Sequence, residues 1–129
     1  MGIFSALFGG NKEAKEKKIL PWIALNAIEQ LKHIQEKSNT KTQVIFKHST
    51  RCGVSRMVLN QFVDAYELTA DDLDLYFLDL VNYRNVSNEV GYMFQVMHES
   101  PQLLVIKNGL VVAHDSHGGV IAIDLNSFV

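Results

Sequence analysis

The residue with the clearest chemical potential is the only cysteine in the chain, Cys52. It lies shortly after the apolar run Val44–Phe46, and an amphipathic helical pattern follows it. A thiol reacts as its thiolate, and a helix N-terminus or a neighbouring cation stabilises that anion. Arg51 and Lys47 are the cations near it in the sequence. The sequence therefore predicts a reactive thiol on a strand-to-helix turn.

Ser55 occupies the position where a second thiol would complete the C-x-x-C pattern of dithiol redox proteins. Its hydroxyl could donate a hydrogen bond to the sulfur of Cys52, but it cannot form a disulfide. A chain with one cysteine also cannot form an intrachain disulfide or an all-cysteine metal site. The lone thiol therefore limits the redox chemistry that the chain can perform by itself. An inert, buried cysteine is the alternative.

Two other segments have residue types suited to substrate binding. Pro101 follows Ser100 at the start of an apolar strand, where a proline need not donate to the sheet. Gly118 and Gly119 indicate either a loop with a permissive backbone or a helix N-terminus whose N–H groups bind a carboxylate. No metal site is expected, because the spacing of the histidines fits no metal-binding motif; these are His48, His98, His114 and His117.

Composition limits the classes of function. The chain has 129 residues, a hydrophobic fraction of 47% and a net charge of −2, which suit a single globular domain. The small charge gives no electrostatic reason to bind nucleic acid or a membrane. We expect a cytoplasmic monomer with a flexible tail over 1–18 and one domain over 19–129. Contact of the tail with a membrane or a partner stays open, because it contains Ile3, Phe4, Leu7 and Phe8.

Hydrophobic periodicity predicts the elements that must position these residues. The expected helices cover about 21–37, Val54–Tyr66 and Val86–Met97, and the expected strands are Val44–Phe46, Leu73–Leu78, Leu103–Ile106 and Leu110–His114. A helix separates the first two strands, so they should be parallel. Asn108-Gly109 is typical of a type I′ turn and predicts a hairpin of the last two strands. With a short C-terminal helix, the order is α-β-α-β-α-β-β-α around a mixed four-stranded sheet.

This order resembles the thioredoxin fold, an α/β class, over nearly everything after the first 20 residues. A closer resemblance is to the YtxJ-like family, the monothiol bacilliredoxins. The segments that carry it are His48–Cys52, Arg84–Asn88, His98–Gln102, Ile106–Gly109 and His114–Gly118.

The resemblance implies a thiol–disulfide oxidoreductase that removes bacillithiol, a low-molecular-weight bacterial thiol, from S-bacillithiolated proteins. The bacillithiol would pass to Cys52, and a second bacillithiol or another redoxin would release it. The resemblance also implies that Ser100 and Pro101 form a loop with a cis proline. The candidate site comprises Cys52 as nucleophile, Lys47, Thr50, Arg51 and Ser55 as supporting residues, and Ser100, Pro101, Gly118 and Gly119 as substrate-binding residues.

One position departs from the family pattern. The family commonly has proline after its cysteine, whereas this chain has Gly53. The run Cys52–Arg56 therefore also resembles the C-G-F-S-R of monothiol glutaredoxins, which bind a [2Fe–2S] cluster between two subunits with two glutathione thiols. An iron–sulfur carrier and a non-catalytic thioredoxin-like adaptor are thus the two alternative functions.

Overall fold

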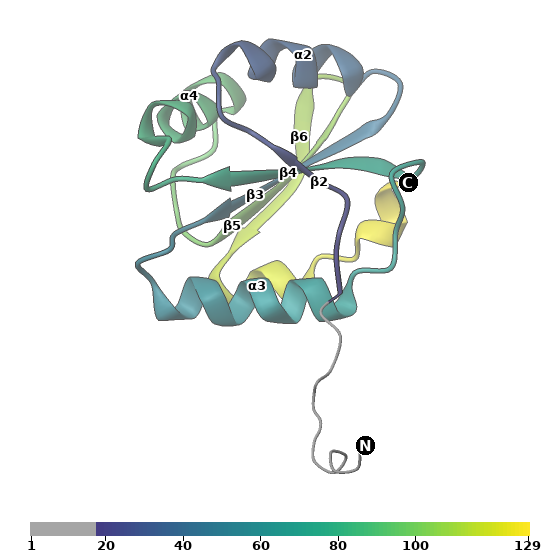
Figure 1. The fold of residues 1–129 in the computed structure, drawn as a ribbon. Helices are drawn as coiled ribbons and strands as arrows, with labels where there is room; N and C mark the ends of the chain where they lie inside the picture. Colours follow the sequence, from purple (N-terminus) through teal and green to yellow (C-terminus); the bar gives the residue numbers. More distant parts are fainter. Residues whose placement is uncertain (1–17) are drawn as a thin grey trace.

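The structure, a computed structural model, describes residues 18–129 as one mixed sheet with helices on both faces (Figure 1). The predicted tail therefore lies outside the described residues, apart from Lys18. The elements are β2 (Trp22–Ala24), α2 (Glu29–Lys37), β3 (Thr42–His48), α3 (Gly53–Ala65), β4 (Leu73–Asp79), α4 (Arg84–Phe94), β5 (Gln102–Lys107), β6 (Leu110–Ser116) and the 3₁₀ helices η1 (His117–Ala122) and η2 (Leu125–Phe128).

The strands lie in the order β2-β4-β3-β5-β6. β3 and β4 are parallel, and β5 and β6 form an antiparallel hairpin, so both pairings predicted from the sequence are confirmed. At the hairpin turn Asn108 and Gly109 have positive φ values of 54° and 79°, as a type I′ turn requires. β5 also pairs antiparallel with β3, which makes the sheet mixed.

The prediction of four strands and of a helix over 21–37 was wrong at the N-terminal end. Trp22–Ala24 instead forms β2, which pairs in parallel with Leu75–Phe77 of β4 as a fifth strand. The indole of Trp22 stabilises this position by packing on Phe77, with ring centroids 5.1 Å apart. The helix begins only at Glu29. The spacing of apolar residues before Glu29 fits a helix equally well. The segment forms a strand only because it pairs with β4.

The C-terminal segment differs as well. In place of one short helix the chain forms η1 and η2, which pack on the same face of the sheet as α3 (Figure 1). The other face is covered by α2 and α4. Because side chains alternate along a strand, Phe46 of β3 points toward α3, whereas Ile45 points toward α2 and α4. All seven residues of β3 are buried, as expected for a central strand covered on both faces.

Within residues 18–129, no helix has both the length and the apolar character needed to cross a membrane.

Candidate functional site

Cys52 lies at the N-cap of α3, between the end of β3 and the first turn of the helix. Its backbone is extended, with φ −120° and ψ 122°, and its side chain is half-buried. Its carbonyl oxygen accepts the Arg56 N–H at 3.2 Å, which closes the first helical turn. The first turn of α3 contains no acidic residue. The thiol therefore lies where unsatisfied helical N–H groups give a partial positive charge.

The Ser55 hydroxyl binds the loop before Cys52. Ser55 is fully buried, accepts the Ser49 N–H at 3.0 Å and lies 3.0 Å from Nδ1 of His48. Because the hydroxyl has one proton, donating it to His48 requires that Nδ1 carry none. In the described part of the chain, no hydrogen bond joins Ser55 to Cys52. Ser55 thus connects the loop to β3 and does not contact the sulfur as a donor.

His48 also belongs to this group, a role that the sequence did not predict for it. It is buried at the end of β3, and its ring centroid lies 5.5 Å from that of Phe77. Burial lowers the pKa of His48, Arg56 lowers it further, and Asp79 opposes the change. The neutral ring favoured at neutral pH is the form that can accept the Ser55 proton. Side chains alternate along a strand, so His48 lies on the same face of β3 as Phe46. This alternation was the signal in the sequence that could have placed His48 beside Phe46.

The remaining residues of the Cys52 loop are more exposed. The Arg56 guanidinium donates to the carbonyl oxygen of Thr50 at 3.4 Å, and the Arg51 N–H donates to the Ser49 hydroxyl at 3.3 Å. A Cβ added to Gly53 would meet only the Arg56 guanidinium, at an ordinary 3.8 Å. Neither steric space nor backbone conformation therefore requires glycine after Cys52.

The Ser100–Pro101 peptide bond is cis. It precedes β5 at the same end of the sheet as the loop that leads to Cys52 (Figure 1). The carbonyl oxygen of Pro101 accepts the His117 N–H at 2.9 Å, which brings the start of η1 beside the proline. The hydroxyl of Ser100 is buried without a hydrogen-bond partner in residues 18–129. Ser100, Pro101 and Gly118 are therefore close together, and η1 packs against the helix that follows Cys52.

The glycine pair differs from its expected geometry. The positive φ in this segment, 54°, belongs to His117, and neither Gly118 nor Gly119 adopts one. A Cβ added to Gly118 would meet open space, whereas one added to Gly119 would overlap the carboxylate of Asp115. A side chain at Gly119 would therefore require the exposed Asp115 carboxylate to move, whereas the backbone conformation does not demand glycine.

Lys47 does not join the Cys52 group. Strand alternation places it with Ile45, on the α4 side of the sheet, whereas His48 faces α3. Its side chain is fully buried, and its ammonium Nζ lies 3.1 Å from Nδ1 of His98. Burial lowers the pKa of Lys47 to about 8.

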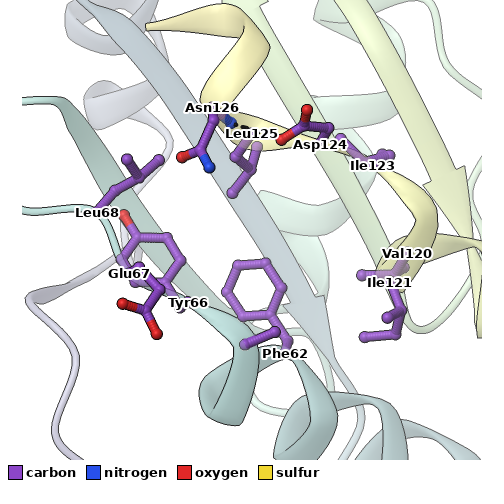
Figure 2. A pocket seen from close by; sticks show the side chains of 11 residues that line it. Phe62, Tyr66, Glu67, Leu68, Val120, Ile121, Ile123, Asp124, Leu125 and Asn126 are labelled. Carbon is purple, nitrogen blue, oxygen red and sulfur yellow. Dashed lines mark hydrogen bonds between the residues drawn. The ribbon is translucent and has the colours of Figure 1, made fainter.

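A hollow in the surface lies far from Cys52, at the other end of α3 (Figure 2). It is lined by the last turn of α3 and by η1, η2 and the residues between them, including Phe62, Tyr66, Val120 and Leu125. The buried Tyr66 hydroxyl has no hydrogen-bond partner among the described residues, and burial with the nearby Asp72 raises its pKa to about 12. At about 1.5 Å per residue, the lining residues Phe62 and Tyr66 lie roughly 15 and 20 Å along the chain direction of α3 from Cys52.

The described residues also include no group of three His, Cys, Asp or Glu side chains placed to hold a metal ion.

Solved structures with this arrangement of elements are thioredoxin-like. One, described provisionally as an oxidoreductase with a thioredoxin fold, is 30% identical, with 78% of this chain and 88% of that chain covered and a TM-score of 0.66. Thioredoxin O2 from Arabidopsis thaliana is 20% identical, with coverages of 83% and 90% and a TM-score of 0.60. Schistosoma mansoni thioredoxin is 17% identical, with coverages of 84% and 92% and a TM-score of 0.60. The protein is thus a thioredoxin-fold thiol oxidoreductase.

The family model for the monothiol bacilliredoxin BrxC matches residues 23–125. The chain therefore belongs to the monothiol bacilliredoxin family, and it is a thiol–disulfide oxidoreductase. The resemblance read from the sequence segments and the thioredoxin-like α/β fold class are both confirmed.

Proposed function

We propose that this protein removes bacillithiol from S-bacillithiolated proteins through a mixed disulfide on Cys52. The observation that carries the proposal is a single half-buried thiol at the N-cap of α3 in a chain of the monothiol bacilliredoxin family. In this proposal the protein works as a cytoplasmic monomer. Its partners are modified proteins and a low-molecular-weight thiol, not nucleic acid.

The reaction requires two exchanges. The Cys52 thiolate attacks the bacillithiol sulfur of the mixed disulfide, and the target cysteine leaves as a thiolate that takes up a proton. The new bond joins Cys52 to bacillithiol. A second bacillithiol thiolate then attacks the bacillithiol sulfur of that adduct, which forms bacillithiol disulfide and regenerates the Cys52 thiolate. The target cysteine is reduced, the incoming bacillithiol is oxidised, the two bacillithiols leave as one disulfide, and the protein itself is unchanged.

The surrounding residues have separate parts in this proposal. The N-terminal N–H groups of α3 stabilise the thiolate, and Ser55 acts through the loop by binding Ser49 and His48. The segment around Ser100, Pro101 and Gly118 receives the substrate next to the thiol. Ser100 supports this assignment, because its hydroxyl is buried without an internal partner and can bind a ligand.

The test is to incubate the protein with a bacillithiol-modified substrate protein and to follow substrate release and the mass of Cys52. We expect a bacillithiol adduct on Cys52 and release of reduced substrate, both lost in Cys52→Ser, whose fold circular dichroism would verify. A glutathione-modified substrate is the matched control for the thiol. Absence of both adduct and release with the intact protein would contradict the proposal.

A further inference from the structure

Lys47 is a buried cation that has no acidic partner. Its side chain is fully buried in the layer between the sheet and α4, and its recorded partner is Nδ1 of His98 at 3.1 Å. No carboxylate lies within ion-pair distance of Lys47 in residues 18–129. Buried charges in proteins are normally paired, because burial without a counter-charge costs free energy. Because burial of the Lys47 ammonium lowers stability, a function is expected for this cation beside the Ser100–Pro101 turn.

The position of Lys47 fixes the tautomer of His98. An ammonium group only donates hydrogen bonds, so Nδ1 of His98 must be its acceptor. The fully buried Ser87 of α4 places its hydroxyl 3.4 Å from the same nitrogen. With Nδ1 used as an acceptor, the proton of the neutral ring is on Nε2. His98 is exposed, so it can present this N–H to a ligand.

The surroundings of His98 are positively charged. Arg84, the first residue of α4, is exposed and has no recorded side-chain partner in the described region. The first turn of α4 has no acidic residue to balance its N-terminus. The acid nearest in sequence, Glu99, is held by the Ser116 hydroxyl and lies 3.6 Å from Nδ1 of His117. The charges of Lys47 and Arg84 act on His98 more strongly than the charge of Glu99, so an anion brought here would meet Arg84 and the Nε2–H of His98 in a net positive field.

A hydrogen bond from β5 holds the segment that contains His98 in place. Gln102 lies opposite Lys47 in the β3–β5 register, and its amide donates to the carbonyl oxygen of Met97 at 2.9 Å. His98 is followed by Glu99 and then by the cis Ser100–Pro101 bond. His98 is thus held at the edge of the segment where the proposed function places the substrate.

We propose that His98 and Arg84 form a carboxylate-binding subsite for the low-molecular-weight thiol of the mixed disulfide, and that Lys47 is the positioning residue that orients His98. The inference rests on the proposed function. It adds to that function a preference for mixed disulfides whose low-molecular-weight thiol is anionic. Lys47 and Arg84 act on an anion through their charge, and the His98 N–H supplies the directed hydrogen bond.

The protonation states agree with this geometry. Burial lowers the pKa of His98, Lys47 and Arg84 lower it further, and Glu99 opposes them. His98 therefore stays neutral at neutral pH, while Lys47, with its pKa lowered to about 8, is still mostly charged.

The test uses one model protein modified with three small thiols of similar length: 3-mercaptopropionate, 2-mercaptoethanol and cysteamine. We expect KM to be lowest for the anionic adduct. Lys47→Met and His98→Phe should each raise KM for that adduct roughly tenfold, the loss of one charge-assisted hydrogen bond, with the neutral adduct changed less than twofold. His98→Gln keeps an outward N–H donor and should restore part of the preference. Equal KM values for the three adducts in the intact protein would overturn the subsite and leave the proposed function standing.

A binding measurement tests the subsite without turnover. Two disulfide probes, 3,3′-dithiodipropionate and its neutral counterpart bis(2-hydroxyethyl) disulfide, would be added to the Cys52→Ser variant while NMR follows the His98 ring. We expect shifts at Nε2 with the anionic probe only, and a higher His98 pKa in Lys47→Met. Equal shifts with both probes, or a His98 pKa unchanged by Lys47→Met, would contradict the inference. An intact protein that forms no Cys52 adduct but shows the selective shift would contradict the proposed function alone.

Discussion

Two buried polar groups lie on the same face of the sheet, near opposite ends of β3, and they differ in charge balance. At one end Asp74 is bonded by Lys37, Lys41 and Gln43 at 2.9, 3.1 and 2.8 Å. At the other end Lys47 contacts His98 and has no acid. In the first group the buried carboxylate is paired with two ammonium groups that are partly exposed to solvent. In the second a single cation is left in the protein interior.

The difference shows what each group contributes. Burial alone would raise the pKa of Asp74, but hydrogen bonds from Lys37, Gln43 and Lys41 outweigh it and hold the pKa below its ordinary value. The charged carboxylate is therefore favoured by folding. The pKa of Lys47 is lowered to about 8, so folding disfavours its charged form. The Asp74 group stabilises the fold, whereas burial of the Lys47 ammonium without an acid reduces stability, and in our proposal its charge serves substrate binding.

The largest effect is expected when the carboxylate of the Asp74 group is removed. Asp74→Asn should lower the free energy of unfolding at pH 7 by about 2–3 kcal/mol, because it removes the charge that pairs with Lys37 and Lys41. A group with a depressed folded pKa stabilises above its unfolded pKa, and this stabilisation is lost as pH falls through the folded pKa. The difference from the parent should thus shrink as pH falls below the ordinary pKa of an aspartate and through the lowered pKa of Asp74. Urea unfolding at several pH values measures it.

The control for that variant is Asp64→Asn on the exposed surface of α3, where a change under about 0.5 kcal/mol is expected. Equal effects of the two variants would show that Asp74 contributes no more to stability than a carboxylate on the surface.

Lys47→Met should have the opposite sign. Methionine fills a similar volume without charge, so we expect about 1–2 kcal/mol of added stability at pH 7. Between the folded pKa of about 8 and the unfolded value of 10.5, the unfolded chain binds more protons, so the parent gains stability as pH rises through this window. The advantage of the variant should therefore shrink from pH 8 to pH 10.5.

Thermal unfolding across this pH range, with the exposed Lys32→Met as control, measures the effect. A destabilised Lys47→Met protein would mean that the two polar groups are both structural.

A third polar group, formed by Ser55, Ser49 and His48 on the α3 face, is uncharged, and we expect its loss to have an effect no larger than that of Lys47→Met. Ser55→Ala removes the bonds to the Ser49 N–H and to His48, and should cost about 1–2 kcal/mol. We also expect faster hydrogen exchange at the Ser49 amide, measured by NMR. Thr40→Ala, which removes an exposed hydroxyl with one bond to the Lys37 carbonyl oxygen, is the control and should cost less. Unchanged exchange at Ser49 would show that Ser55 does not hold the loop.

Local patterns were sufficient for much of the fold. The Asn108-Gly109 turn, the parallel pair around α3 and the position of Cys52 before that helix each depend on neighbouring residues. β2 could not be predicted in this way, because its three residues form a strand only through their pairing with β4.

In the candidate site, too, local sequence patterns predict some features, whereas others depend on contacts between distant residues. The alternation of β3 fixes that Lys47 and His48 face opposite sides, but nothing local states which side carries α3. The contact of Lys47 with His98 joins residues 51 positions apart, and the Ser55 hydroxyl contacts a ring seven positions earlier. Both contacts form only in the folded chain. The prediction from the sequence therefore placed Lys47 and Ser55 near the sulfur of Cys52 instead.

The inward orientation of the Ser55 hydroxyl has a consequence for a second thiol at this position. A mutation to cysteine there would restore the two-thiol motif, but a thiol is a weak hydrogen-bonding group, and the Ser49 N–H and the His48 ring would lose a good partner. Ser55→Cys would therefore supply a second thiol and at the same time loosen the loop that presents Cys52. The hydrogen bonds that fix this loop thus disfavour a two-thiol motif in this chain.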